Sequence, residues 1–286
     1  MSDQQSTSNN TYLLDTESAT EMARLINLDR YLTKSMGGPL SEQPDPSRFQ
    51  QVLDLACGPG GWVLNVAFAY PEMEVAGIDI STTMIAYANA RARSQKLLNA
   101  SFGIMSILEP LDFADESFDL INARFLVVAL KRDAWPHVLR ECMRILRPGG
   151  VLRLTENNTL GVTNSPAFER LMVVTGRIAQ LAGYGFSSEE GNLGMMPMLE
   201  PLLRDAGCQQ IQIREHAMDF SAGTEAHLDK YHDTDILFHA WQSRLISTGM
   251  ITQQEMEQLS QQLPIEMLAN DFRGVLHFLT AWGTKP

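Results

Sequence analysis

Basic residues are scarce in this sequence. Its 22 lysines and arginines stand against 34 aspartates and glutamates, so the formal net charge is −12. An acidic surface repels phosphate backbones, which argues against DNA or RNA as a partner. No apolar run approaches the ~20 residues of a membrane-spanning helix, and the first segment, MSDQQSTSNN, has no apolar signal core. We therefore expect a cytoplasmic protein with neither a nucleic-acid partner nor a membrane partner.

Cysteine is also rare. Cys57, Cys142 and Cys208 lie far apart, form no CxxC pair and lack the spacing of zinc ligands. This usage is typical of a reduced, intracellular protein, and we expect no bound metal. Apolar residues, in contrast, make up 44% of the 286 positions, which is enough for one sizeable core.

Strand-like and helix-like segments alternate along the first half of the chain. Apolar runs typical of strands occupy residues 52–56, 74–80, 101–107, 118–123 and 151–156. Helical patterns at 82–98 and 132–146 separate some of them. This alternation predicts a doubly wound α/β fold with a mostly parallel sheet. After residue 156 the pattern changes, and the segment GVLHFLTAWG near the C-terminus predicts a buried last strand.

The segment VLDLACGPGGW, residues 52–62, passes from an apolar strand directly into a glycine-rich corner. Gly58 and Gly60 lack a Cβ, so a ligand can approach their backbone at the end of the first strand, where doubly wound sheets bind ligands. Asp79 follows Gly58 by twenty-one residues, the position from which a carboxylate accepts hydrogen bonds from ribose hydroxyls. The pattern therefore predicts a ligand that contains ribose. The structural alternative is a corner that serves only as a tight turn.

Two common nucleotide motifs do not fit this corner. Val63 replaces the third glycine of the dinucleotide fingerprint GxGxxG, which argues against a nicotinamide oxidoreductase. A Walker loop needs a lysine followed by serine or threonine, and the corner has no such lysine.

Four segments carry a family resemblance. VLDLACGPGGW, VAGIDIS, FADESFDLINARF and LRPGGVLRLTE resemble, in order and spacing, the class I S-adenosylmethionine-dependent methyltransferases. The resemblance covers about residues 51–156, and the chain is more narrowly similar to small-molecule methyltransferases related to a fungal regulator of secondary metabolism. It implies a Rossmann-like, seven-stranded sheet, S-adenosyl-L-methionine as cofactor and S-adenosyl-L-homocysteine as product.

The resemblance also implies which residues contact the cofactor. Asp79 would hold the ribose hydroxyls, Ile80 would pack on the adenine, and Tyr12 with the first helix would close over the cofactor as a lid. In chain order, the implied contacts are Tyr12, Ala56, Gly58, Gly60, Asp79, Ile80, Met105, Ser106, Ile107, Asn122, Arg124 and Phe125. The sequence departs from the family at Ala56, where glycine is usual, and at Ser106 or Ile107, where an aspartate is frequent.

The methyl acceptor is expected to be a small, partly apolar molecule methylated at O, N or C. Glu156 and Asn157, at the end of the fifth strand, are predicted to face it, together with Met195 and Met196 of an adaptable apolar wall. For the methionines the alternative is ordinary packing in the core. The catalytic residue is not identified, and Glu156 and His216 are candidate bases for an acceptor that holds a proton at neutral pH. For Glu156 the alternative is a carboxylate that caps a neighbouring loop.

The domain organisation follows from these segments. We expect a flexible tail at residues 1–10, an N-terminal helical lid at 11–48 and a cofactor-binding core at 49–156. Residues 157–286 complete the core, with cap insertions near 157–201 and 221–271, and a homodimer is compatible with the C-terminal helices. A different class stays open: a cofactor-binding regulator or assembly subunit with little turnover.

Overall fold

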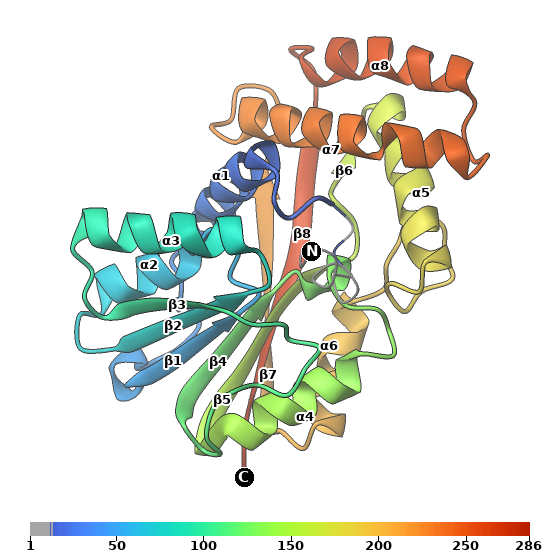
Figure 1. The fold of residues 1–286 in the computed structure, drawn as a ribbon. Helices are drawn as coiled ribbons and strands as arrows, with labels where there is room; N and C mark the ends of the chain where they lie inside the picture. Colours follow the sequence, from blue (N-terminus) through green and yellow to red (C-terminus); the bar gives the residue numbers. More distant parts are fainter. Residues whose placement is uncertain (1–11, 13) are drawn as a thin grey trace, which may run out of the picture.

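A central β-sheet carries helices on both faces and a further group of helices at one end (Figure 1). The structure, a computed structural model, describes residue 12 and residues 14–286, so the expected tail at 1–10 lies outside the described residues. The helices are α1 (Ala19–Ser35), α2 (Gly61–Ala69), α3 (Thr82–Gln95), α4 (Trp135–Ile145), α5 (Pro166–Leu181), α6 (Leu199–Asp205), α7 (His227–Ser247) and α8 (Gln253–Met267). Short 3-10 turns lie at η1 (Pro46–Arg48), η2 (Leu126–Val128) and η3 (Met196–Met198).

The sheet confirms the predicted doubly wound fold. Its strands are β1 (Gln51–Leu55), β2 (Glu74–Asp79), β3 (Ala100–Ile104), β4 (Phe118–Arg124), β5 (Leu146–Asn157), β6 (Val162–Thr163), β7 (Gln209–Asp219) and β8 (Gly274–Thr284). The order is β3-β2-β1-β4-β5-β8-β6, with β7 also paired to β8, and β1 to β5 are parallel. The described chain thus has eight strands rather than the expected seven, because the two-residue β6 pairs with the first residues of β8.

The strand order reverses at β1, which has β2 on one side and β4 on the other. The connections that follow β1 and its neighbour β4 run in opposite directions, which opens a crevice at the carboxyl ends of these strands. Doubly wound proteins bind ligands in such a crevice. β8 is the exception to the parallel arrangement, because it runs antiparallel to β5, β6 and β7.

Local sequence explains where the helices begin. The side chains of Ser18, Ser81, Ser165 and Thr252 each accept a hydrogen bond from a backbone N–H in the first turn of α1, α3, α5 and α8. Such N-caps satisfy donors that the helix itself leaves without partners. Lys96, with a φ of 57°, caps α3, which therefore ends at Gln95, three residues before the expected end.

Three apolar clusters hold these layers together. One face of the sheet packs on α4 and α6 through residues such as Ile121, Trp135 and Leu203. The opposite face packs on α2 through Val52, Trp62 and other residues. Burial of such side chains is the main favourable term in folding.

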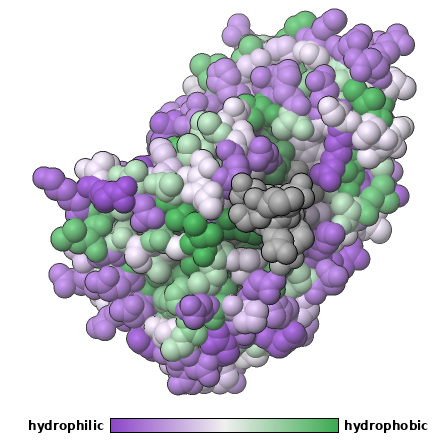
Figure 2. Space-filling view, in the orientation of Figure 1, coloured by the Kyte–Doolittle hydropathy of each residue, from purple (hydrophilic) through white to green (hydrophobic). Residues whose placement is uncertain are grey.

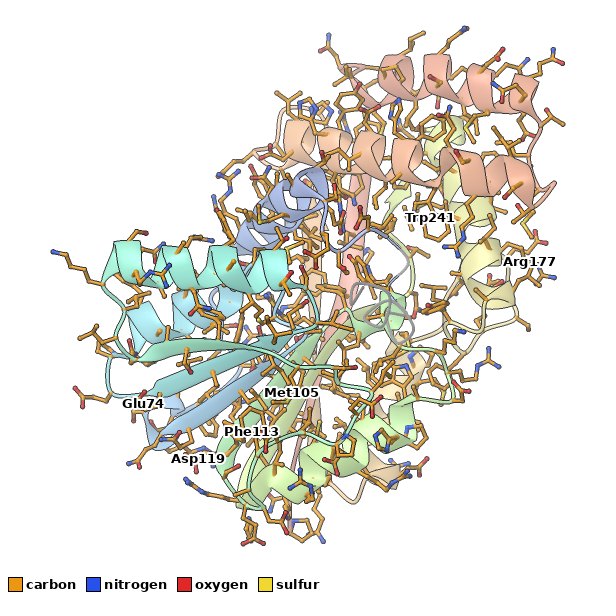
Figure 3. The ribbon with its side chains drawn as sticks, in the orientation of Figure 1. Glu74, Met105, Phe113, Asp119, Arg177 and Trp241 are labelled. Atoms are coloured by element: carbon orange, nitrogen blue, oxygen red, sulfur yellow. The ribbon has the colours of Figure 1, made fainter. Side chains whose placement is uncertain are left out.

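The third cluster joins α1 to α5, α7 and α8. We call α5, α7 and α8 the cap helices. They lie together at one end of the sheet (Figure 1), and Trp241 of α7 is directed toward α5 (Figure 3). The expected insertions at 157–201 and 221–271 contain α5 and the α7–α8 pair respectively. Within the described residues, no helix is long and apolar enough to cross a membrane.

Candidate functional site

A cavity of about 300 Å³ lies at the carboxyl ends of the central strands. Its walls come from the loops after β1, β2, β3, β4 and β5, from α1, and from α5 and α7 of the cap. In the space-filling view, hydrophobic residues gather near the centre of the face, between hydrophilic residues of α3 and of the cap helices (Figure 2). The crevice predicted by the strand order is therefore roofed by helices.

The glycine corner forms part of the cavity wall. Ala56 and Gly58 adopt left-handed conformations, with φ values of 50° and 54°, and both line the cavity. This conformation is strained for alanine by about 1–2 kcal/mol, which explains why a glycine suits position 56. The corner is closed by hydrogen bonds from the N–H of Cys57 to the carbonyl of Ile78 (2.9 Å) and from the N–H of Gly60 to the carbonyl of Cys57 (3.1 Å).

Gly60 itself is not among the described residues that line the cavity, so its predicted direct contact with a ligand is not supported. Its φ is +77°, and a Cβ at this position would lie 2.6 Å from the ring of Phe102 and 2.9 Å from the Cβ of Ala88. Gly60 is thus required for packing of the corner against β3 and α3. The neighbouring Gly61 lines the cavity, and a Cβ there would lie 2.2 Å from the carboxylate of Asp29.

Asp79 lies at the end of β2 with its carboxylate at the cavity. It accepts hydrogen bonds from the N–H of Gly58 (2.8 Å) and the N–H of Ser81 (2.9 Å). Burial raises the pKa of Asp79, against the effect of these backbone donors. An ionised carboxylate has about four lone-pair sites, so two hydrogen bonds leave capacity for two hydroxyl groups.

The wall beside Asp79 is mostly apolar. Ile80, Met105 and Ile107 line the cavity, with Ser106 between the last two. β3 ends at Ile104, earlier than the run predicted, and residues 105–107 therefore form a turn along the cavity. The hydroxyl of Ser106 accepts a hydrogen bond from the N–H of Leu108 (3.3 Å).

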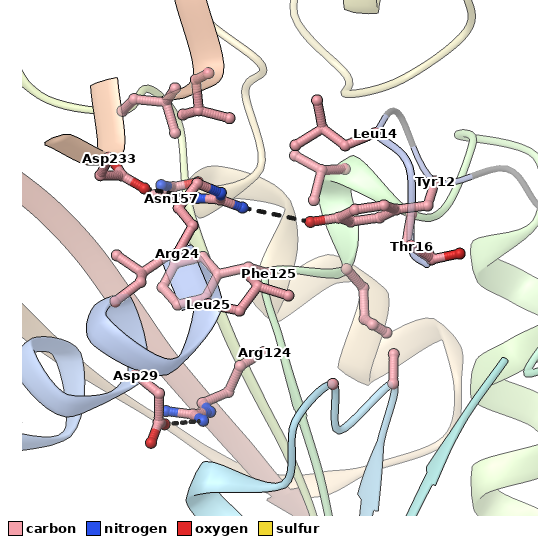
Figure 4. A pocket seen from close by; sticks show the side chains of 18 of the residues that line it. Tyr12, Leu14, Thr16, Arg24, Leu25, Asp29, Arg124, Phe125, Asn157 and Asp233 are labelled. Carbon is pink, nitrogen blue, oxygen red and sulfur yellow. Dashed lines mark hydrogen bonds and ion pairs between the residues drawn. The ribbon is translucent and has the colours of Figure 1, made fainter. Parts of the chain in front are cut away.

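A charged group closes the other side of the glycine corner. Arg124, at the end of β4, lines the cavity and pairs with Asp29 of α1 at 2.5 Å (Figure 4). Phe125 follows it and also lines the cavity. Asp54 of β1 completes this group. Burial raises the pKa of Asp54 to about 7, although Arg124 and a hydrogen bond from Asn122 lower it.

Asn122 does not line the cavity within the described chain, contrary to the prediction. Asp54, Asn122 and Arg153 lie directly opposite one another on β1, β4 and β5, so all three share one face of the sheet. Asn122 donates to Asp54 (2.6 Å) and accepts from Arg153, which in turn pairs with Glu42 of the loop after α1 (2.6 Å). Asn122 thus orients Asp54, and the buried row links the N-terminal segment to the cavity.

The structure does not support Glu156 as a residue that faces the acceptor. Its side chain is buried and accepts hydrogen bonds from the N–H groups of Leu126 (2.6 Å) and Val127 (3.4 Å). It therefore caps the loop after β4, which was the structural alternative. Burial raises its pKa well above the usual value, against these backbone donors. Asn157, the next residue, points the other way along the strand and lines the cavity.

His216 is also placed away from the described cavity lining. It lies on β7, stacks on Phe278 with ring centroids 5.1 Å apart, and shares a hydrogen bond of 3.1 Å with the hydroxyl of Thr280. Burial lowers its pKa to about 4, with further lowering by Arg153 and Arg214. The imidazole packs against Phe278 and Thr280 of β8 and is not among the described residues that line the cavity.

Met195 and Met196 do not form the predicted apolar wall. Met195 is fully buried in the core beside α4 and α6, and Met196 packs against the same core. The reason is Asn158, whose carbonyl and side chain accept from the N–H groups of Leu193 (2.9 Å) and Met196 (2.8 Å). This anchors the segment so that Leu193, rather than the methionines, lines the cavity.

Tyr12 and α1 lie over the cavity. Tyr12 donates to Glu21 (2.8 Å), and its pKa is raised, chiefly by burial.

Sequence reasoning missed several residues that line the cavity. The charged ones are Arg24, Asp29, Asp54, Lys230 and Asp233. Asp54 had a signal, since it interrupts an apolar strand, whereas nothing local marks the others.

Comparisons with known proteins agree with this geometry. A family model described as a methyltransferase domain matches residues 52–150. Demethylmenaquinone methyltransferase of Bacillus cytotoxicus is 26% identical over 181 residues, which are 60% of this chain and 75% of that protein. Methyltransferase pytC of Aspergillus terreus is 29% identical over 139 residues, covering 48% of this chain and 39% of that protein.

Solved structures show the same fold. Phosphoethanolamine N-methyltransferase 2 of Haemonchus contortus, in complex with phosphomonomethylethanolamine and S-adenosylhomocysteine, superposes with a TM-score of 0.55. It is 18% identical, and the superposition covers 95% of this chain and 58% of that chain.

Residues 52–150, which the family model matches, thus form a methyltransferase domain of class I, the class that uses S-adenosylmethionine as cofactor. The family resemblance of the sequence is thereby confirmed, while the narrower fungal subgroup stays a prediction. The chain spans only part of some curated relatives, with 56% of the uncharacterized protein RP028 of Rickettsia prowazekii and 39% of pytC aligned.

Proposed function

We propose that this domain transfers the methyl group of S-adenosylmethionine to a small, partly apolar acceptor bound beneath the cap helices. The observation that carries the proposal is one cavity with two unlike parts. The part at the strand ends has the carboxylates and the arginine that suit a nucleoside and an amino acid. The part under α5 and α7 is lined mainly by apolar side chains, which suit a second, partly apolar molecule.

The polar part fits the cofactor group by group. Asp79 would accept from the ribose hydroxyls, and Ile80 and Met105 would pack on the adenine. Arg124 would bind the carboxylate of the methionine end, and Asp54 and Asp29 would face its ammonium group. Such charge-assisted hydrogen bonds are the strong ones in proteins.

The bound cofactor would supply an electrophilic methyl group on a positively charged sulfur. The chain's own contribution is to hold the acceptor about 3 Å from the methyl group, in line with the sulfur, and to exclude water. The roof of α1, α5 and α7 serves this exclusion. None of the six histidines is among the described lining residues, and we assign the catalysis to alignment of the acceptor and exclusion of water.

The alternative is a regulator that binds the cofactor with little turnover. An open, shallow edge would favour it, and the apolar part of the cavity beneath α5 and α7 favours the enzyme instead. A homodimer and a cytoplasmic location stay predictions from the sequence.

The test is calorimetric titration of S-adenosylmethionine and S-adenosylhomocysteine into the wild type and Asp79→Ala. Loss of the ribose contacts should weaken binding by about ten- to hundred-fold. Asp119→Ala is the matched control, because Asp119 also accepts from two backbone N–H groups, of Gln50 and Gln51 (2.8 Å each), but lies away from the cavity. The proposal fails if the wild type binds neither compound at millimolar concentration, or if both variants weaken binding equally.

A further inference from the structure

A buried group of charged residues lies where α1 meets α7. We call it the cap cluster: Tyr12, Glu21, Arg24, Lys230 and Asp233. Arg24 pairs with Glu21 and with Asp233, each at 2.7 Å, and Lys230 pairs with the second oxygen of Asp233 at 2.7 Å. Figure 4 shows the guanidinium of Arg24 between Asp233 and Tyr12, apart from the Arg124–Asp29 pair.

The cluster is part of the cavity wall. Tyr12, Arg24, Lys230 and Asp233 all line the cavity. The side chains of Arg24, Asp233 and Lys230 are only 6%, 8% and 3% exposed. Burying charges in this way is costly unless every donor and acceptor has a partner.

A count of hydrogen bonds finds the largest spare donor capacity at Lys230, because Arg24 already uses four of its five N–H donors. Glu21 accepts two hydrogen bonds from Arg24 and one from Tyr12, and the two oxygens of Asp233 accept from Arg24 and Lys230. An ammonium group has three N–H donors. Within the described chain, that of Lys230 donates to Asp233 alone, and it also lies over the ring of Phe220, 5.8 Å from the ring centroid. Lys230 thus holds donor capacity at the cavity wall that the described residues do not use.

The cap side of the same cavity is otherwise mainly apolar. Its wall comes from the cap helices, the segment after β5 and the start of β8. Its residues are Leu160, Leu171, Met172, Ala179, Leu237, Phe238, Trp241 and Leu276. A molecule bound there would be largely apolar, with an oxygen atom as the group that a buried ammonium recognises.

The charge balance of the cap cluster limits which molecules can bind beside it. The two cations, Arg24 and Lys230, face the two anions, Glu21 and Asp233, so the cluster is balanced as it stands. A neutral oxygen acceptor preserves this balance, whereas a carboxylate or phosphate would bring an uncompensated charge into a buried site.

We propose that the cap cluster is the polar end of the acceptor site, where Lys230 donates a hydrogen bond to a carbonyl or hydroxyl oxygen of an uncharged, otherwise apolar molecule. This rests on the proposed function, because it takes the cap side of the cavity as the acceptor side. Lys230 is a specificity-determining residue in this view, and no proton transfer is assigned to it.

Three probes with the same apolar body test the proposal. We would titrate 2-acetonaphthone, naphthalene and 2-naphthoate into the wild type saturated with S-adenosylhomocysteine. The ketone should bind about ten- to hundred-fold more tightly than naphthalene, which lacks the oxygen, and more tightly than the anionic naphthoate. The proposal is overturned if naphthalene binds as well as the ketone, if naphthoate binds best, or if none of the three binds.

The variant Lys230→Met assigns the effect to one group. It should remove the advantage of the ketone over naphthalene and leave the affinity for naphthalene and for S-adenosylhomocysteine unchanged. Lys34→Met is the matched control, because Lys34 is 64% exposed on α1 and lies outside the cavity lining. If Lys230→Met keeps the full advantage, Lys230 is not the donor. If Lys230→Met does not fold, Lys230→Arg should keep the advantage, and its loss there overturns the assignment. Absence of S-adenosylhomocysteine binding to the wild type would instead refute the proposed function.

Discussion

Asp54 should make cofactor binding depend on pH near neutrality. Its carboxylate is 3% exposed, lines the cavity and has a pKa of about 7 in the protein without ligand. The ionised form would pair with the ammonium group of S-adenosylhomocysteine. Below pH 7 the carboxyl of Asp54 is mostly protonated, so it would have to release this proton for the ligand to bind. With a pKa of about 7, the ionised fraction falls from about 0.9 at pH 8 to about 0.1 at pH 6. Affinity should therefore fall about ten-fold over this range.

The stability of the protein without ligand should change in the opposite direction. The folded-state pKa of Asp54 lies above its usual value of 3.8, so the folded protein binds this proton more tightly than the unfolded chain does. The contribution of Asp54 to stability is thus fully present below pH 3.8 and is lost as pH rises toward 7. Saturating S-adenosylhomocysteine should offset this loss, because the bound form favours the ionised carboxylate.

The assay is calorimetry at several pH values between 5.5 and 8, with Asp54→Asn as the comparison. The amide keeps an oxygen that can accept the hydrogen bond from Asn122 but cannot ionise. Its affinity for S-adenosylhomocysteine should be lower than that of the wild type at pH 8 and should change little with pH. The reasoning is refuted if the variant and the wild type show the same pH dependence.

Three further substitutions test the structure in urea unfolding and methyl-transfer assays. Gly60→Ala should cost about 2–4 kcal/mol through its positive φ and its overlap with neighbours; Gly149→Ala, at a φ of +78° with open space around it, should cost clearly less. Glu156→Gln should retain methyl transfer, because this residue caps a loop. Complete loss of methyl transfer in a stably folded variant would show that Glu156 is catalytic after all. Glu42→Gln should cost about 3–5 kcal/mol, since it leaves the buried Arg153 without its charged partner, and a neutral effect would contradict the buried pair.

The elements of this fold could be read from local patterns. Apolar strand runs alternating with helices predicted the doubly wound sheet, and the sheet confirms it because hydrophobic periodicity directly reflects which side of an element is buried. The placement of Asp79 beside Gly58 likewise followed from a fixed spacing, since the end of β2 must adjoin the corner after β1. Errors at element ends, as at Ile104, were of a few residues.

The orientation of individual side chains was not predictable in the same way. Glu156 and Asn157 are adjacent at the end of β5, yet one caps the loop after β4 and the other lines the cavity. Successive side chains of a strand point to opposite faces, and which face holds unsatisfied N–H groups depends on a loop from another strand. Spacing could place both residues at the edge but could not divide their roles.

The sequence by itself determined the sheet, the glycine corner and the class of cofactor, because these depend on periodicities and spacings within short segments. Only the tertiary structure decided what covers the cavity. Arg24 and Asp233 are 209 positions apart, and Glu42 and Arg153 are 111 apart. These contacts form because buried charges must find partners wherever packing brings them, and no local pattern in either segment encodes the partner's position.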